Sequence, residues 1–181
     1  SSNASSTPYS LKVLLDETDQ YECNNSFVDA KEFKDDQSIK ITLADERDAD
    51  YFKFKPSRTG VLRISLENVP QQLAPRIEIF NSANQRLELD GSDYGKNVYS
   101  DATVCDTETY YFAIYSYSSG DKSPKAMDLK AYLDVSDVFE CNNTFTDAKE
   151  IQSGVKNKIA IGDEGDRDYF KLNVTKPGVI E

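Results

Sequence analysis

The sequence predicts an all-β protein made of antiparallel two-sheet β-sandwiches arranged in tandem modules. Three observations support this fold class: apolar residues alternate with polar ones in many short segments, turn residues separate these segments, and part of the sequence repeats with an offset of 118 residues. Such alternation is typical of antiparallel sheets with one face in water. About seven or eight short strands in roughly 115 residues fit a two-sheet sandwich.

The expected strands follow the chain in order. Phe52 and Phe54 alternate with polar or amphipathic neighbours, and Leu62, Ile64 and Leu66 continue the pattern after a turn. Later segments with the same alternation contain Ile77 and Ile79, then Tyr110, Phe112 and Ile114, and finally Leu129, Ala131 and Leu133. Each of these apolar sets is expected to face the core.

Turn residues mark the boundaries between the expected strands. Residues 56–60, 90–93 and 118–121 are rich in Pro, Gly, Ser and Asp, which favour turns. Residues 26–31 contain the clearest hint of a helical turn. The remaining pattern is β throughout.

An internal repeat sets the expected domain boundaries. Residues 11–63 align without a gap onto residues 129–181, with 25 identities in 53 positions. Such a match indicates tandem modules. We expect residues 1–18 to hold a linker and the last strand of a preceding module, 19–135 to form a complete module, and 136–181 to be the opening part of a following, truncated one. That last piece is too short to bury a core alone.

Composition excludes several classes of function. Lys and Arg number 21 against 32 Asp and Glu, so the formal charge of −11 argues against nucleic acid or an anionic membrane as partner. The chain has no histidine, which removes His-based acid–base catalysis and the commonest zinc ligand. No run of 18 apolar residues predicts a membrane span. Asp48 and Asp50 are weak candidates for a hydrolase pair because they share one end of one strand. We expect no enzyme.

Two acidic, Asn-rich segments, each present twice, predict a site for a hard cation. Calcium takes six to eight oxygen ligands from carboxylates, amides and backbone carbonyls. Crowding several carboxylates without a cation is costly, since like charges at ~4 Å repel by several kcal/mol at intermediate dielectric. The alternative is that these residues are solvated turn formers and caps. The candidate ligands are Glu22, Asn24, Asn25, Asp45, Asp48 and Asp50 in the first copy, and Glu140, Asn142, Asn143, Asp163, Asp166 and Asp168 in the second.

Three cysteines are placed unevenly on the repeat. Cys23 and Cys105 lie within the complete module, and Cys141 repeats Cys23, so the partner of Cys141 is expected beyond residue 181. We therefore predict a Cys23–Cys105 disulfide and an oxidising compartment. The alternative is that these cysteines are free thiols.

A tyrosine stripe is the candidate ligand-binding face. Tyr111, Tyr115 and Tyr117 have the parity opposite to the core-facing residues of their strand, which places them on the solvent face. Tyrosine suits stacking on sugar rings or proline-rich helices. The alternative is that these side chains only stabilise the sheet through cross-strand pairs.

The order of these motifs resembles that of the bacterial pre-peptidase C-terminal domains, which include the collagen-binding domains of clostridial collagenases. The motifs are Glu-x-Asn-Asn at 22–25, Asp-Ala at 29–30, Asp-x-Asp-Tyr-Phe at 48–52 and Tyr-Tyr-Phe at 110–112. The resemblance implies a jelly-roll-like, non-catalytic domain of a secreted protein. It also implies calcium between the Glu-x-Asn segment and the aspartates, and collagen-binding tyrosines in the late strand. Calcium-binding members tend to carry another acid where Gln20 and Val138 stand, so one or two ions remain open.

Together these features predict a secreted or cell-surface accessory module, stabilised by Ca²⁺ and repeated in tandem. Its role would be to target or space a secreted enzyme or surface protein. The expected partners are an extracellular protein or polysaccharide and the neighbouring modules of the same chain. Two alternatives stay open: a carbohydrate-binding module, and a purely structural adhesin spacer.

Overall fold

The computed structural model describes residues 10–13, 19–135, 137–162 and 166–180. In these residues the regular elements are nearly all strands, with one short 3-10 helix, η1 (Phe145–Asp147). The strands are β1 (Lys31–Phe33), β2 (Gln37–Leu43), β3 (Ala49–Phe54), β4 (Gly60–Glu67), β5 (Pro75–Phe80), β6 (Arg86–Gly91), β7 (Val98–Val104), β8 (Tyr110–Ser116), β9 (Ser123–Asp134), β10 (Lys149–Ile151) and β11 (Phe170–Leu172).

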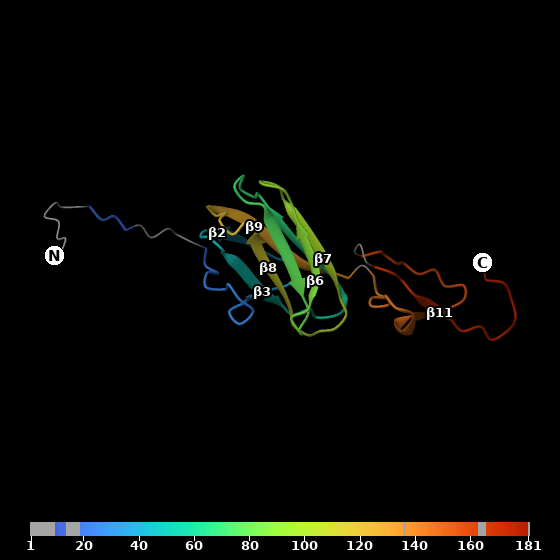
Figure 1. The fold of residues 1–181 in the computed structure, drawn as a ribbon. Coiled ribbons are helices and arrows are strands. Elements are labelled where there is room, and N and C mark those ends of the chain that lie inside the picture. The colour runs from blue at the N-terminus through green and yellow to red at the C-terminus, as the bar shows by residue number, and fades with distance from the viewer. Residues whose placement is uncertain (1–9, 14–18, 136, 163–165, 181) are drawn as a thin grey trace.

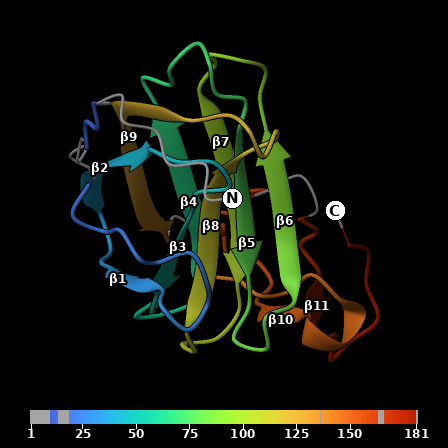
Figure 2. The same cartoon turned by 60° about the vertical axis from the view of Figure 1, so that its left-hand side comes forward.

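Strands β1 to β9 form a sandwich of two sheets (Figures 1 and 2). One sheet has the order β1-β3-β8-β5-β6 and the other β2-β9-β4-β7. The neighbouring strands pair antiparallel, except that β1 and β3 run parallel. Over most of the chain, consecutive strands lie in different sheets. The predicted all-β, antiparallel two-sheet sandwich is confirmed.

The core lies between the two sheets and consists of the residues that alternation assigned to it. Phe52, Phe54, Phe112 and Leu62 are fully buried, and Ile64 is nearly so. The rings of Phe52 and Phe112 stack with centroids 5.3 Å apart, across the β3–β8 pair. Burial of such side chains contributes roughly 1.5–3 kcal/mol each relative to exposure. The core therefore fixes which side chains of β3 and β8 face inward.

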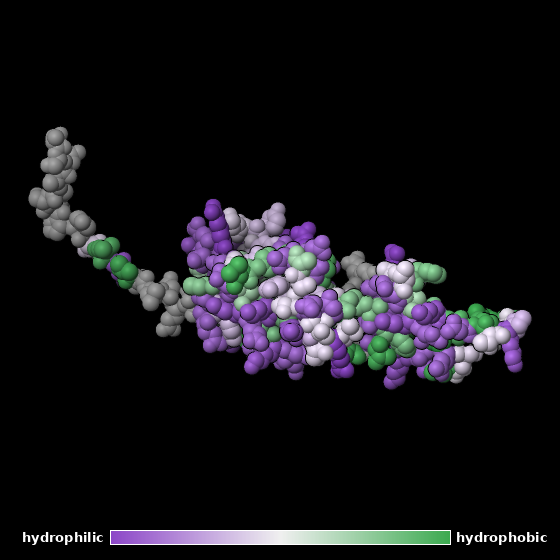
Figure 3. Space-filling view, turned by 90° about the horizontal axis from the view of Figure 1, so that it is seen from below, coloured by the Kyte–Doolittle hydropathy of each residue, from purple (hydrophilic) through white to green (hydrophobic). Residues whose placement is uncertain are grey.

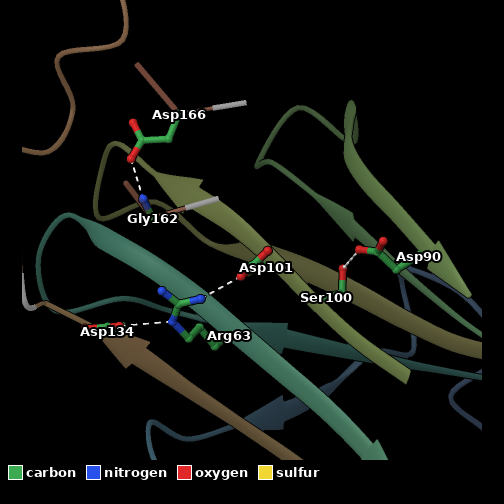
Figure 4. Close-up of polar contacts among 7 residues, drawn as sticks. All are labelled: Arg63, Asp90, Ser100, Asp101, Asp134, Gly162 and Asp166. Carbon is green, nitrogen blue, oxygen red and sulfur yellow. Dashed lines mark hydrogen bonds and ion pairs between the residues drawn. The ribbon is translucent and has the colours of Figure 1, made fainter. Parts of the chain in front are cut away.

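One expected turn is misplaced. Residues Asp90 and Gly91 belong to β6 instead of the turn predicted at 90–93. Both residues continue the pairing of β6 with β5, with Asp90 opposite Ile77. The Asp90 carboxylate also accepts a hydrogen bond of 2.7 Å from the Ser100 hydroxyl on β7 of the other sheet (Figure 4). Gly91 lies opposite Arg76, whose side chain occupies the space that a Cβ at this position would need. Both residues thus serve packing at the sheet edge.

The C-terminal piece, of which residues 137–162 and 166–180 are described, repeats the local structure of the sandwich's opening. Its strands β10 and β11 pair in parallel with Lys149 opposite Phe170, the same register in which Lys31 stands opposite Phe52 in β1 and β3. Its apolar residues are far less covered, since Ile161 is 64% exposed whereas Leu43, the matching residue of the sandwich, is 1% exposed. Figure 3 shows hydrophobic residues on the surface of this piece. It buries little apolar surface of its own.

Among the described residues, no helix is long and apolar enough to pass through a membrane.

Candidate metal centre

The segment before β1 is tied to the start of β3 by hydrogen bonds. The Tyr51 amide donates to the Asn24 carbonyl at 2.9 Å, and the Asn24 side-chain amide donates back to the Tyr51 carbonyl at 3.3 Å. Asp19 anchors the same segment to β2, because one carboxylate oxygen accepts from the Tyr21 amide at 2.8 Å and the other from the amide and hydroxyl of Thr42. These contacts bring the Glu-x-Asn segment beside the aspartates.

Asp48 and Asp50 lie at the start of β3. Asp50 has the parity of Phe52 and Phe54, so its carboxylate faces the inside of the sandwich and is fully buried. Asp48 is also buried, and one of its oxygens accepts a hydrogen bond of 2.9 Å from the Ala44 amide. We call Asp19, Glu22, Asn24, Asp48 and Asp50 the first cluster.

Several oxygens of the first cluster are buried without a hydrogen-bond donor among the described residues. They are Glu22 Oε1, Asn24 Oδ1, Asp48 Oδ1 and both carboxylate oxygens of Asp50. The Asn24 amide lies close enough to Asp50 to act against the rise of its pKa, but no hydrogen bond of good geometry joins the two side chains. Buried polar groups are normally satisfied, and an exception calls for an explanation such as an ion.

Burial and crowding raise the pKa values of the carboxylates in the first cluster. Burial, with the nearby charges of Asp19 and Asp48, raises the pKa of Asp50 to about 8. Burial and the charges of Asp48, Asp19 and Asp45 raise the pKa of Glu22 to about 7. The pKa of Asp48 is also raised, chiefly by burial. The cluster therefore disfavours its own ionised form unless a positive charge lies among the carboxylates.

The donor chemistry fits a hard cation, although the carboxylates alone do not complete a site. Within the described residues, no group of three or more acidic or cysteine side chains already has an arrangement that could hold a metal ion. The Asn24 oxygen, backbone carbonyls, water and small shifts of the carboxylates would have to contribute. Oxygen-only donors of this kind suit calcium.

The structure refines the predicted ligand set. It brings Glu22, Asn24, Asp48 and Asp50 together, whereas the Asn25 side chain is exposed. Asp45 is also exposed, but it lies close enough to raise the pKa of Glu22 and of Asp48. Sequence reasoning missed Asp19. The available signal was its recurrence as Asp137 in the repeat.

The C-terminal piece rebuilds the cluster from matching residues. The Asn142 side-chain amide donates to the Tyr169 carbonyl, and the Tyr169 amide donates to the Asn142 backbone carbonyl, as between Asn24 and Tyr51. Asp137 accepts from the Ala160 amide at 2.6 Å, as Asp19 does from the Thr42 amide. We call Asp137, Glu140, Asn142, Asp166 and Asp168 the junction cluster.

The junction cluster also contains buried oxygens without donors among the described residues. Asn142 is fully buried and its Oδ1 has no donor, and neither carboxylate oxygen of Asp168 has one. Burial, with Asp137 and Asp166 nearby, raises the pKa of Asp168. The Asn143 amide, in the orientation that satisfies it, donates to Asp166 at 2.9 Å, so this predicted ligand supports the cluster from outside. The predicted ligand Asp163 lies outside the described residues.

The predicted Cys23–Cys105 disulfide is wrong. Cys105 pairs with Cys141, with Cα atoms 5.4 Å apart, and Cys23 is an exposed free thiol in the described structure. The strand order explains the difference. Cys23 is next to Asn24, which is hydrogen-bonded to Tyr51 near the start of β3. Cys105 lies shortly before Tyr110 of β8, and Tyr110 is paired with Phe54 at the end of β3. The two cysteines thus belong to opposite ends of the sandwich, and Cys105 lies at the end where β9 leads into the C-terminal piece.

Further contacts surround this disulfide. The Thr59 hydroxyl donates to the Glu140 backbone carbonyl at 3.2 Å. Gly162 packs so closely on Val61 that a Cβ at Gly162 would overlap the valine methyl, and its amide donates to the Asp166 carboxylate (Figure 4). Val61 has the outward parity of Arg63 on β4 yet is only 4% exposed. The junction cluster therefore lies against the wall of the sandwich.

The tyrosine stripe is only partly free. Tyr111 packs edge-on against Phe27, with ring centroids 5.4 Å apart. Tyr115 donates to Glu78 at 3.0 Å, and burial with that carboxylate raises its pKa to about 12. Tyr117 is 72% exposed, with the Arg76 guanidinium 4.9 Å from its ring centroid. A hollow of about 350 Å³ lies here; its lining includes Arg47, Asp48, Tyr51, Glu78, Tyr115 and Tyr117.

Among the comparisons with known proteins, only the comparison with solved structures finds similar proteins. No family model and no curated protein matches the sequence. The pre-peptidase C-terminal domain of a collagenase from Bacillus anthracis is 12% identical, with a TM-score of 0.44, over 58% of this chain and 94% of that one. A mitogen from Yersinia pseudotuberculosis is 12% identical, with a TM-score of 0.41, over 56% and 87%.

A third likeness is CorA, described as a surface-associated copper-binding protein important in copper acquisition by Methylomicrobium album BG8. It is 8% identical, with a TM-score of 0.42, over 58% of this chain and 98% of that one. Sequence identities and TM-scores this low do not allow the function of any of these proteins to be assigned to this chain. The first of the three structures bears the name of the family that the sequence resembles.

Proposed function

We propose that the sandwich is a non-catalytic, calcium-stabilised accessory module of a secreted or cell-surface protein, repeated in tandem, which targets or spaces the protein to which it belongs. The observation that carries this proposal is the first cluster, in which buried oxygens of Asn24, Asp48 and Asp50 meet no donor in the described structure. The recurrence of the same arrangement around Asn142 and Asp168 supports it. A bound calcium ion would supply the missing positive charge.

The proposed secreted or cell-surface location is supported by the Cys105–Cys141 disulfide, because disulfides persist in oxidising compartments such as the extracellular space. The acidic composition, with a formal charge of −11, suits a soluble extracellular module that binds cations.

Calcium should raise the thermal stability of the protein, and Asp48→Asn should weaken this effect. Ligand at 100 times its Kd adds about 2.7 kcal/mol, enough to shift Tm by several degrees. Thermal unfolding with calcium, magnesium or chelator measures the shift. Asp93→Asn, which removes an exposed carboxylate outside both clusters, is the control and should behave like the parent. A parent protein whose Tm ignores millimolar calcium would contradict the proposal.

The ligand that we propose is an extracellular protein or polysaccharide, bound at the hollow beside Tyr115 and Tyr117. Its aromatic walls offer stacking surfaces, and Arg47 and Glu78 offer polar contacts. A carbohydrate is the second candidate because rings of sugars stack on such tyrosines while their hydroxyls bond charged groups. The resemblance to a family with collagen-binding members makes collagen the first probe.

Tyr117→Ala should weaken binding of the ligand at least tenfold without changing stability, because the side chain is largely exposed. Tyr99→Ala is the matched control: Tyr99 is 60% exposed but lies on β7 of the other sheet. Binding to immobilised collagen and to a glycan array separates the two ligand classes. If no probe binds, or both variants lose binding equally, the hollow is not the ligand site.

A further inference from the structure

The two clusters share their chemistry but differ in what holds them. The first cluster is built within the sandwich, with Asp50 inside β3 and Asp19 bonded to β2. The junction cluster stands on a piece whose strands β10 and β11 have three residues each. Such short strands leave the piece with few contacts to fix its own loops. Hydrogen bonds of Asn142 and Asp137 within the piece support the junction cluster, and contacts from outside the piece can add to this support.

Cys141 lies between two members of the junction cluster, Glu140 and Asn142, and is covalently bonded to Cys105 of the sandwich. Its counterpart Cys23 lies between Glu22 and Asn24 of the first cluster and is exposed and free in the described structure. The disulfide is therefore present at the junction cluster but absent from the first cluster, although both contain the same Glu-Cys-Asn-Asn sequence. The same chain holds a tethered and an untethered version of the site.

The sandwich also supplies a wall on the other side of the junction cluster. Val61 presses on Gly162, whose amide binds the Asp166 carboxylate, and Glu140 is held at its carbonyl by Thr59. At the position matching Gly162 the first cluster has Ala44, whose amide binds Asp48 in the same way. The hydrogen bond itself thus tolerates a Cβ. Glycine is needed at 162 because the valine approaches so closely.

We propose that the sandwich and the Cys105–Cys141 disulfide complete the junction cluster as an inter-module cation site, so that its calcium affinity depends on the disulfide while that of the first cluster does not. This rests on the proposed calcium function. The site would link two consecutive modules through one covalent bond and one ion. Loss of the disulfide would lower calcium affinity because the flanking Glu140 and Asn142 would lose their fixed positions.

The test reads each cluster separately in the whole chain by calorimetric titration with calcium. Asp50→Asn leaves the junction cluster intact, and Asp168→Asn leaves the first cluster intact. Adding Cys141→Ser to Asp50→Asn should lower calcium affinity at least tenfold, whereas adding it to Asp168→Asn should change affinity less than twofold. Equal effects in both backgrounds, or no effect in the Asp50→Asn background, would overturn the proposal.

A second pair of variants leaves the disulfide in place. Gly162→Ala in the Asp50→Asn background should lower calcium affinity, since the added methyl meets Val61. The matched Ala44→Gly in the Asp168→Asn background should leave affinity unchanged. An unaltered affinity in Gly162→Ala would refute the role of the sandwich wall. If neither Asp50→Asn nor Asp168→Asn binds calcium, the proposed function itself fails, which is a distinct result.

Discussion

Without calcium, raising the pH from about 5 to about 8 should destabilise the protein by roughly 3–4 kcal/mol, since one pKa unit corresponds to about 1.4 kcal/mol. Folding raises the pKa of Asp50 from its ordinary value of 3.8 to about 8. Between these values the folded state binds more protons than the unfolded state, so stability falls as the pH rises and levels off above the folded pKa. Glu22, with its pKa raised to about 7, adds to the same trend.

Saturating calcium should remove most of this loss, because a divalent charge among the carboxylates favours their ionised forms. Denaturant unfolding at several pH values, with chelator and with calcium, measures both effects. Asp50→Asn is the informative variant: it should flatten the pH dependence in chelator and reduce the gain from calcium. A metal-free protein that grows more stable from pH 5 to 8 would contradict the assigned burial of Asp50.

Cys141→Ser should release the C-terminal piece from the sandwich. The disulfide spans 36 residues, and the loop-entropy account gives such a cross-link roughly 4 kcal/mol. Apart from the contacts of Thr59 and Val61, the piece has little to hold it, as Ala148 is its one buried hydrophobic residue among those described. Hydrogen exchange should show β10 and β11 losing protection while β3 and β8 keep theirs.

Cys23→Ser is the control for this experiment, because Cys23 is free and exposed in the described structure. It should leave exchange unchanged in both parts. Unchanged protection of β10 and β11 in Cys141→Ser would show that the contacts of Thr59 and Gly162 hold the piece without the covalent bond.

Period-two alternation was enough to predict the sandwich and its inward faces. Phe52, Phe112 and Leu62 are buried as expected, because a strand with one apolar face leaves a single choice of side. The repeat was enough to find most of the first cluster, since Glu22, Asn24, Asp48 and Asp50 recur with it. Each of these follows from local spacing along the chain.

The disulfide could not be predicted in the same way. Its pairing depends on which end of the sandwich each cysteine occupies, and that follows from strand order, which spacing does not encode. Asp90 was misplaced for a related reason, because β6 continues through it by pairing with Ile77 of β5, a partner that turn-forming residue types do not indicate. Asp19 was overlooked because it precedes the motif, although its bond to Thr42 brings it into the cluster.

The central claim is that the first cluster binds calcium, and calorimetric titration of the parent chain beside Asp50→Asn tests it most directly. We expect the parent to bind calcium with a dissociation constant of millimolar or tighter, within the range of extracellular calcium modules. The Asp50→Asn variant should lose the binding that belongs to the first cluster. No binding heat from the parent at millimolar calcium, or identical titrations of the two proteins, would contradict the claim.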